Sequence, residues 1–313
     1  MNDEIVKKLK NLNNELNRKY FLLDSLSISE KRKILLELGN FSHIIPMDKK
    51  ELQELEKLGG VYAVDGSTNR FGGAFPHYIQ IFQGIAIKDL TYKKESVEIY
   101  CPILEETDIY EEKNIVERLL AKVELDVAIK ALDENPKMII MDGSLIRYRI
   151  ICPNTWENFI DILLEKQVIV VGVIEDIKTN LIFENIKKDY DMDFFYDREF
   201  LFNCLEYGEC FTPLITDRGK NNYGIVSSFF RTSTDPTVIA VDMLEDQKEN
   251  REFIHELILS ITARKSRGIP YILDLVDMKA RITNKNIKSL CESYISKDKF
   301  ELLFHSQRDK RGM

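Results

Sequence analysis

The stretch Gly59-Gly60-Val61-Tyr62-Ala63-Val64-Asp65-Gly66-Ser67-Thr68 decides how the rest of the chain is interpreted. It has the pattern of an apolar strand that ends in one carboxylate, Asp65, followed by small residues. A second stretch of this kind, Met138-Ile139-Ile140-Met141-Asp142-Gly143-Ser144-Leu145, places Asp142 77 residues later. In neighbouring strands of one sheet the two acids would lie side by side. Carboxylates that close repel each other unless a cation lies between them, so the pair predicts a metal site.

The segments around these two strands predict a mixed sheet flanked by helices. In chain order, the expected elements are strands at 61–65, 77–88 and 97–104, a helix at 114–132, a strand at 137–141, a helix at 156–166 and a strand at 168–174. Short connections make the first three strands an antiparallel meander. The order β-β-β-α-β-α-β is the ribonuclease-H-like arrangement, in which right-handed crossovers place the fourth strand beside the first.

Two further regions flank or interrupt this core. Residues 1–58 predict an N-terminal helical arm, suited to self-association, to partner docking or to packing on the chain's own core. Residues 59–313 form the main domain, with an inserted α+β segment at about 176–250. The expected elements outside the core are helices at 2–22, 30–38, 49–57, 197–205, 254–265 and 273–282, and strands at 224–230 and 238–241.

Composition points to a cytoplasmic globular protein. The chain has 313 residues, 44% of them hydrophobic, and no run approaches the roughly 18 apolar residues of a membrane span. Its polar start, Met1-Asn2-Asp3-Glu4, does not have the pattern of a signal peptide. Five cysteines without a Cys-x-x-Cys pair favour reduced thiols over a structural zinc site.

Charge is distributed unevenly along the chain. The formal net charge is −8, yet residues 261–313 carry 12 Lys and Arg against 6 Asp and Glu. A basic C-terminal quarter on an acidic body is compatible with a phosphate-binding face, and equally with an ordinary solvated surface.

A site that binds two cations needs a third and a fourth carboxylate. Two hard cations about 4 Å apart can hold the attacking and leaving oxygens of a phosphodiester. In the helix at 114–132, Glu124 is bracketed by apolar residues and is preferred to Glu117, which stays the alternative. In the last predicted helix, Asp277 and Asp274 compete for the fourth position.

Other chemistries have weaker support. The chain contains no Gly-x-x-x-x-Gly-Lys-Ser/Thr element, which excludes a P-loop ATPase, and His77 and His255 fall in structural patterns. An actin-like ATPase or sugar kinase also places Asp-Gly-Ser/Thr corners around phosphates, but it requires two copies of the meander. A non-catalytic DNA clamp that docks a translocase is the alternative from another class.

The sequence resembles the NurA family of prokaryotic DNA end-processing nucleases from about Val61 to Arg311. The resemblance is carried by the segments Ala63-Val64-Asp65-Gly66-Ser67, the helix around Glu124, Ile140-Met141-Asp142-Gly143-Ser144-Leu145, Tyr196-Asp197-Arg198-Glu199, Pro270-Tyr271-Ile272-Leu273 with Asp277, and His305-Ser306-Gln307-Arg308-Asp309-Lys310-Arg311. No single short motif decides the assignment, but their order and spacing together are specific.

The resemblance implies a ribonuclease-H-like core and a Mn²⁺-dependent (or Mg²⁺-dependent) 5′→3′ exonuclease that is also a single-strand endonuclease. It further implies a ring-shaped homodimer, DNA as substrate, and a HerA-type hexameric ATPase as partner. Asp65, Glu124 and Asp142 match the family's acidic metal ligands, Tyr271 matches a site tyrosine, and Asp277 falls where the family has His or Asp. The expected guides for the DNA backbone are Arg264, Lys265, Arg267, Arg281, Arg308 and Lys310.

Overall fold

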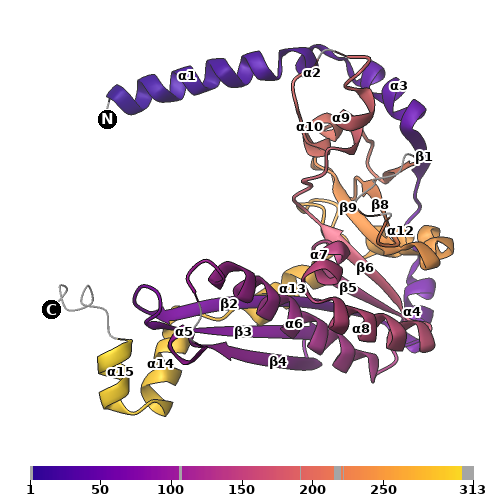
Figure 1. Ribbon diagram of the computed structural model, residues 1–313. Helices are drawn as coiled ribbons and strands as arrows, with labels where there is room; N and C mark the ends of the chain where they lie inside the picture. The colour runs from indigo at the N-terminus through magenta and orange to yellow at the C-terminus, as the bar shows by residue number, and fades with distance from the viewer. Residues whose placement is uncertain (1–2, 106–107, 191, 215–219, 221, 305–313) are drawn as a thin grey trace.

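The computed structural model describes residues 3–105, 108–190, 192–214, 220 and 222–304. Within this part of the chain nine strands form one mixed sheet, in the order β1-β7-β8-β9-β6-β5-β2-β3-β4 (Figure 1). The strands are β1 Gly39–His43, β2 Val61–Gly72, β3 Tyr78–Ile87, β4 Lys93–Tyr100, β5 Met138–Asp142, β6 Ile169–Ile174, β7 Glu209–Pro213, β8 Ile225–Phe230 and β9 Ile239–Leu244.

Helices surround this sheet and extend the chain at both ends (Figure 1). They are α1 Asp3–Lys19, α2 Phe21–Ser25, α3 Ile28–Leu38, α4 Lys49–Lys57, α5 Pro102–Glu105, α6 Glu112–Leu132, α7 Leu145–Ile151, α8 Pro153–Glu165, α9 Leu181–Ile186, α10 Asp197–Leu201, the 3₁₀ helix η1 Glu245–Asn250, α12 Arg251–Ser260, α13 Tyr271–Ala280, α14 Asn284–Tyr294 and α15 Lys297–Leu303.

The predicted ribonuclease-H-like core is confirmed. Strands β2, β3 and β4 form an antiparallel meander, and β5 and β6 then follow as parallel strands on the other side of β2. A second run of antiparallel strands, β7-β8-β9, joins the same sheet through the antiparallel pairing of β9 with β6. Among the described residues no strand follows β9, so this run lacks the parallel strands that complete the first copy, and the two complete copies that an actin-like protein requires are not found there.

The two faces of the sheet are covered by different helices, and alternation along each strand decides which side chain meets which helix. Ala63 and Ile140 pack in a core with residues of α12 and α13. Val64 and Met141 pack in a second core with residues of α6, α7 and α8. A side chain on β2 or β5 at this level therefore faces either the α12–α13 side of the sheet or the α6–α8 side.

The prediction that the first strand ends at Asp65 is wrong. Strand β2 continues through Gly66-Ser67-Thr68 to Gly72, and Gly66 pairs with Gly84 of β3. Asp-Gly-Ser is typical of a turn, but here the long antiparallel partner β3 keeps these residues extended. The second Asp-Gly-Ser does end its strand: β5 stops at Asp142, and Gly143 has a left-handed φ of 97°.

Several other boundaries differ from the sequence-based expectations. The third strand of the meander is 93–100 instead of 97–104, because the chain turns into α5 at Pro102. Helices α5, α7, α9, α14 and α15, the 3₁₀ helix η1 and strands β1 and β7 were not predicted. Strand β1 pairs with β7, so the N-terminal arm and the segment 176–250 both extend the same sheet. The domain boundary at residues 58 and 59 stays a prediction.

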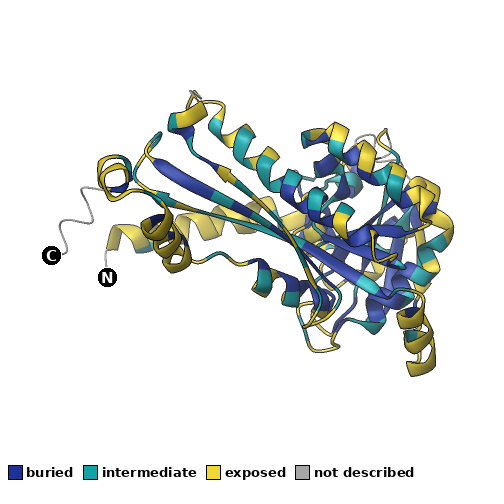
Figure 2. Ribbon diagram, turned by 90° about the horizontal axis from the view of Figure 1, so that it is seen from below, coloured by how far each residue is buried: buried dark blue, intermediate teal, exposed yellow. Residues whose placement is uncertain are grey.

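The N-terminal arm begins with a helix that leaves the body of the protein. Helix α1 projects away from the sheet and has no buried residue (Figures 1 and 2). Helices α3 and α4 start at capping boxes formed by Ser27 with Glu30 and by Asp48 with Glu51, as their sequences favour. None of the described helices combines the length and the apolar character needed to cross a membrane.

Candidate active site

Asp65 and Asp142 lie next to each other on neighbouring parallel strands. The β2–β5 pairing places Val64 opposite Met141, one residue before each acid. Because side chains alternate along a strand, Asp65 follows Ala63 and Asp142 follows Ile140 onto the face covered by α13. The two acids therefore lie side by side on the sheet, as the sequence predicts.

Glu124 approaches these acids from helix α6 on the opposite face. Its side chain is almost completely buried, with 2% of the residue exposed. A Cβ atom on Gly66 would lie 2.6 Å from the Cγ and Oε1 atoms of Glu124, and one on Gly84 would collide with the carbonyl oxygen of Val123. The paired glycines thus leave the space that lets α6 and Glu124 lie against the sheet.

The alternative acid on α6, Glu117, is placed differently. It is exposed and lies 3.8 Å from the ammonium group of Lys113. Of the two candidates on this helix, Glu124 is the one that the structure brings to Asp65 and Asp142.

Arg147 is a site residue that the sequence did not single out. It lies on α7, directly after the turn that follows Asp142, and its guanidinium group donates to the carboxylate of Glu124 in an ion pair. The segment Leu145–Ile151 shows no local signal of this role, because the partner lies 23 residues away on another element. A buried carboxylate needs such a partner, and that requirement could have prompted a search for one.

Helix α13 contributes Asp277 to the rim of the site. Asp277 is exposed, and its charge acts on both Asp65 and Asp142. Asp274, the alternative on this helix, accepts a 2.7 Å hydrogen bond from Arg267 and is already paired. Tyr271 is the first residue of α13 and is 55% exposed.

The extension of β2 beyond Asp65 fixes the end of α13. The hydroxyl of Ser67 donates to the carbonyl oxygen of Ala280. Two residues later, the Asn69 amide donates to the carbonyl oxygen of Ile282 at 2.9 Å. These contacts tie the helix that carries Asp277 to the strand that carries Asp65.

Burial and mutual repulsion disfavour the charged forms of the three inner acids. Burial, together with the carboxylates of Asp142 and Glu124, raises the pKa of Asp65 to about 7. Burial raises the pKa of Glu124 to about 7 although the Arg147 guanidinium opposes this. The pKa of Asp142 is also raised, by burial first, while Arg267 acts in the other direction. A cation at this position would offset the repulsion.

The donor set suits a hard divalent cation, since Mg²⁺ and Mn²⁺ prefer carboxylate oxygens. Across the described ranges, however, no three His, Cys, Asp or Glu side chains form a group that could hold a metal ion on their own. Asp65 and Asp142 project from one face of the sheet, whereas Glu124 comes from the other and is held by Arg147. Mg²⁺ is commonly bound by one or two carboxylates, waters and substrate phosphates. The pair Asp65 and Asp142 fits a cation site of that kind.

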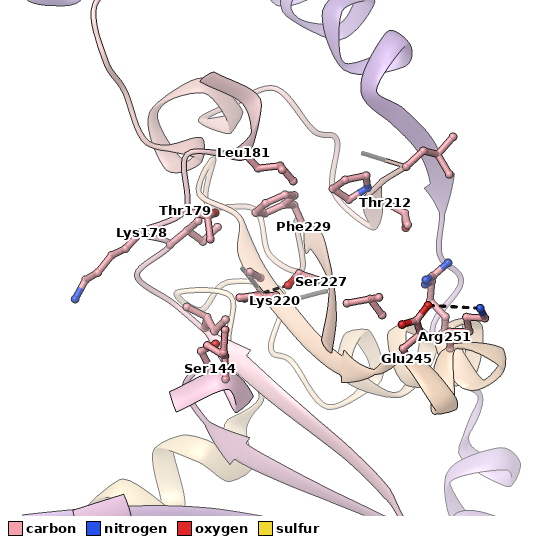
Figure 3. Close-up of a pocket in the computed structure, with 18 of the residues that line it drawn as sticks. Ser144, Lys178, Thr179, Leu181, Thr212, Lys220, Ser227, Phe229, Glu245 and Arg251 are labelled. Atoms are coloured by element: carbon pink, nitrogen blue, oxygen red, sulfur yellow. Dashed lines mark hydrogen bonds and ion pairs between the residues drawn. The ribbon is translucent and has the colours of Figure 1, made fainter. Parts of the chain in front are cut away.

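A buried polar network supports the turn after Asp142. Asp242 on β9 is completely buried and accepts hydrogen bonds from the Ser144 hydroxyl at 2.6 Å, from the Ser227 hydroxyl at 2.6 Å and from the Lys220 ammonium at 2.5 Å. Ser144, Ser227 and Lys220 also line a cavity of about 640 Å³, in which Figure 3 shows Lys220 beside Ser227. The turn that carries Asp142 is thus anchored to β8 and β9.

Of the expected basic guides that the structure describes, Arg267 is the one whose charge acts on Asp142. Arg267 donates to Glu175 and to Asp274, both at 2.7 Å, and Arg264 lies over the ring of Tyr207. Arg281 lines a second, apolar cavity between the meander and α14. Arg308 and Lys310 lie outside the described residues.

The two histidines set aside as structural differ in burial. His255 is buried and its Nε2 atom lies 2.7 Å from the Ser228 hydroxyl, away from the acids. His77 lies directly before β3 and is exposed.

Comparison with solved structures supports the fold. The structure is similar to the crystal structure of the NurA nuclease from Sulfolobus solfataricus, with a TM-score of 0.64 and 14% identity over 95% of this chain and 98% of that one. More distant similarity is found to a Ciona intestinalis endonuclease V bound to DNA (TM-score 0.40, 12% identity, 84% and 96% of the two chains) and to human endonuclease V (0.39, 13%, 87% and 99%).

Sequence comparison identifies the family. A search of curated proteins found no match. Residues 59–282, however, match the NurA domain, and this segment contains all four carboxylates described above. The chain therefore belongs to the NurA family of nucleases, which are hydrolases that act on DNA.

Proposed function

We propose that this chain cleaves DNA with the help of Mn²⁺ or Mg²⁺, as a 5′→3′ exonuclease and single-strand endonuclease that processes the ends of double-strand breaks. The observation that carries this proposal is the pairing of Asp65 and Asp142 on neighbouring parallel strands, where burial raises the pKa of Asp65 to about 7. The carboxylates of Asp65 and Asp142 repel each other, and the neighbouring Asp277 is exposed. This arrangement favours a reaction assisted by a cation over acid–base catalysis by the protein alone. The polarity and the repair role rest on the resemblance to NurA.

Each candidate residue would have a role that follows from its position in the site. Asp65 and Asp142 would hold the cations, with Glu124 below them and Asp277 at the rim completing the acidic set. When bound, such cations activate the attacking water and stabilise the leaving oxygen of the phosphodiester. Tyr271, exposed at the start of α13, would orient the scissile phosphate or stack on a base. Arg264, Lys265, Arg267 and Arg281 would guide the DNA backbone.

A cleavage assay with matched variants tests this proposal. Linear duplex DNA labelled at the 5′ or the 3′ end reports polarity, and circular single-stranded DNA reports endonuclease activity. D65N, E124Q and D142N should each lose Mn²⁺-dependent cleavage by about 100-fold or more. E117Q, an exposed glutamate on the same helix as Glu124, should cleave like the wild type.

The outcomes of this assay show which acids are needed for cleavage. Undiminished cleavage by D65N would remove Asp65 from the site and with it the proposed mechanism. The pair D277N and D274N decides the fourth position, because only Asp277 acts on Asp65 and Asp142 whereas Asp274 is paired with Arg267. We expect the larger loss with D277N.

The proposal includes a homodimer and a HerA-type hexameric ATPase as partner. Both rest on the resemblance to NurA, and one observation supports a protein interface. Helix α1 exposes Ile5, Leu9, Leu12 and Leu16 along one face, at 46–58% of their surfaces. Apolar stripes of this kind mark contacts with another protein chain. We also propose a cytoplasmic location, since all five cysteines are unpaired in the structure.

A further inference from the structure

Arg147 occupies an unusual position between the acids and the outside of the protein. Its guanidinium group pairs with Glu124, whose side chain is 3% exposed, while its own side chain keeps 34% exposure. The guanidinium therefore holds a buried carboxylate although its own side chain is only partly buried, and its central carbon lies 4.8 Å from the centre of the Tyr148 ring. A side chain placed only to neutralise Glu124 would not need that exposure.

The hydrogen-bonding capacity of Arg147 is largely unused. A guanidinium group has five N–H donors, and among the described residues Glu124 is the one hydrogen-bond acceptor of Arg147. Its Nε atom is buried without a partner. Arg267, the other arginine near Asp142, differs in this respect because both arms of its guanidinium are engaged, one with Glu175 and one with Asp274.

The local charge balance also leaves room for a role beyond the ion pair. Asp65, Glu124 and Asp142 place three carboxylates around one arginine, and all three interact with its charge. A phosphate would approach such a site only where a cation or a guanidinium offsets these charges. Arg147 supplies that positive charge from the protein itself.

We propose that Arg147 is a positioning residue that binds a phosphate oxygen of the DNA strand while it holds Glu124 in place. This inference rests on the proposed function and adds a residue to it. The planar guanidinium can donate to a carboxylate along one edge and to a phosphate along another, whereas a lysine ammonium is a single point charge that cannot fix both. Lys would therefore preserve the charge of this contact but not its geometry.

Salt dependence of DNA binding measures the contact without any cleavage. The probe is a short fluorescein-labelled single strand, titrated with protein in the presence of a chelator at several salt concentrations. Each phosphate contact to a single strand contributes about 0.7 to the slope of log K against log salt. R147Q should lower the magnitude of that slope by about 0.7. R149Q, on the same helix but bound to the carbonyl oxygen of Tyr223, should leave the slope unchanged.

The lysine variant separates charge from geometry. R147K should keep the wild-type slope, yet its kcat with Mn²⁺ should fall by up to about 100-fold with little change in KM, because Glu124 loses its guanidinium partner and keeps only the hydrogen bond to Tyr148. Circular dichroism checks that each variant is folded. If R147Q alone fails to fold, E124Q/R147Q removes both charges of the buried pair and carries the measurement instead.

The outcomes distinguish this inference from the proposed function. A slope for R147Q equal to that of the wild type and of R149Q would overturn the phosphate contact and leave Arg147 as a structural partner of Glu124. Absence of any binding by the wild type would overturn it as well. A wild type that binds DNA but cleaves it with no cation would contradict the proposed function, while the slopes would still decide the role of Arg147.

Discussion

The charge states of individual acids govern both the chemistry and the stability of this site. Asp65 lies beside Asp142 and close to Glu124, and burial with their repulsion raises its pKa to about 7. The carboxylate is therefore harder to ionise in the folded protein than in the unfolded chain, where the pKa is about 3.9. Without a cation, a site of this kind reduces stability at neutral pH for the sake of function.

The first prediction concerns pH and the D65N variant. The pKa of Asp65 is higher in the folded protein than in the unfolded chain, so folding favours the protonated side chain. This contribution to the free energy of unfolding is complete below about pH 4 and is lost as the pH rises through about 7. In chelator, the free energy of unfolding of the wild type should fall over this range. D65N should lack that part of the decrease and be more stable at pH 8, by on the order of 3 kcal/mol.

Urea unfolding at pH 5 and pH 8 in chelator measures this difference. D161N, which replaces an exposed aspartate on α8, is the matched control and should follow the wild type. The same loss of stability with pH in D65N as in the wild type would show that Asp65 is not the strained acid.

At this scale the sequence predicts some site residues and misses others for physical reasons. Asp65 and Asp142 follow strand patterns, so neighbouring strands suffice to bring them together. Glu124 could be preferred to Glu117 from its apolar surroundings, and the structure places it accordingly. Arg147 has no such local signature, because its role depends on a contact between two helices.

Contacts with neighbouring elements hold the turn after Asp142 in place. The turn between β5 and α7 is bound to β9 through Ser144, whose hydroxyl donates to Asp242. Asp242 is neutralised by Lys220, and both side chains are almost fully buried. A buried ion pair is costly to break because removing one partner leaves the other charge uncompensated.

The second prediction tests this anchor. K220M should lower the free energy of unfolding by about 3–5 kcal/mol, since Asp242 would remain charged and buried. Urea unfolding measures the change. K187M breaks an exposed lysine–glutamate pair, with Glu184, and should cost about 0–1 kcal/mol. Similar values for the two variants would mean that Lys220 does not stabilise the buried carboxylate.

Element order could be predicted from the sequence, but several element ends could not. The meander and the two crossovers follow from apolar runs and short connections. The extension of β2 to Gly72 could not be predicted, because Gly66 and Ser67 favour turns and are kept extended only by β3. The short strands β1 and β7 do not alternate between buried and exposed residues. They could not be predicted because they are stabilised by pairing with each other at the end of the sheet.

At the scale of the whole molecule, the apolar stripe of α1 stays exposed in the part of the chain that the structure describes. The described body buries its cores on both faces of the sheet, yet α1 extends beyond it (Figure 1) and buries none of its residues. An isolated amphipathic helix of 17 residues is only marginally stable in water. Its apolar stripe is therefore the surface on which we expect a second copy of the chain to pack.

The third prediction tests that interface. L9E/L12E places two charges on the apolar stripe and should convert a dimer to a monomer, as measured by light scattering after size exclusion. N11E/N14E adds the same charge to the opposite face of α1 and should leave the dimer intact. A dimer that persists in L9E/L12E would show that the stripe is not its interface.

The central claim is that Asp65 and Asp142 together bind a divalent cation, and anomalous diffraction from crystals soaked in Mn²⁺ tests it most directly. We predict an anomalous peak between the two carboxylates, with oxygen distances of about 2.0–2.6 Å, that disappears in D65N. Crystals of the wild type with no peak at this position, or with Mn²⁺ bound only elsewhere, would contradict the claim.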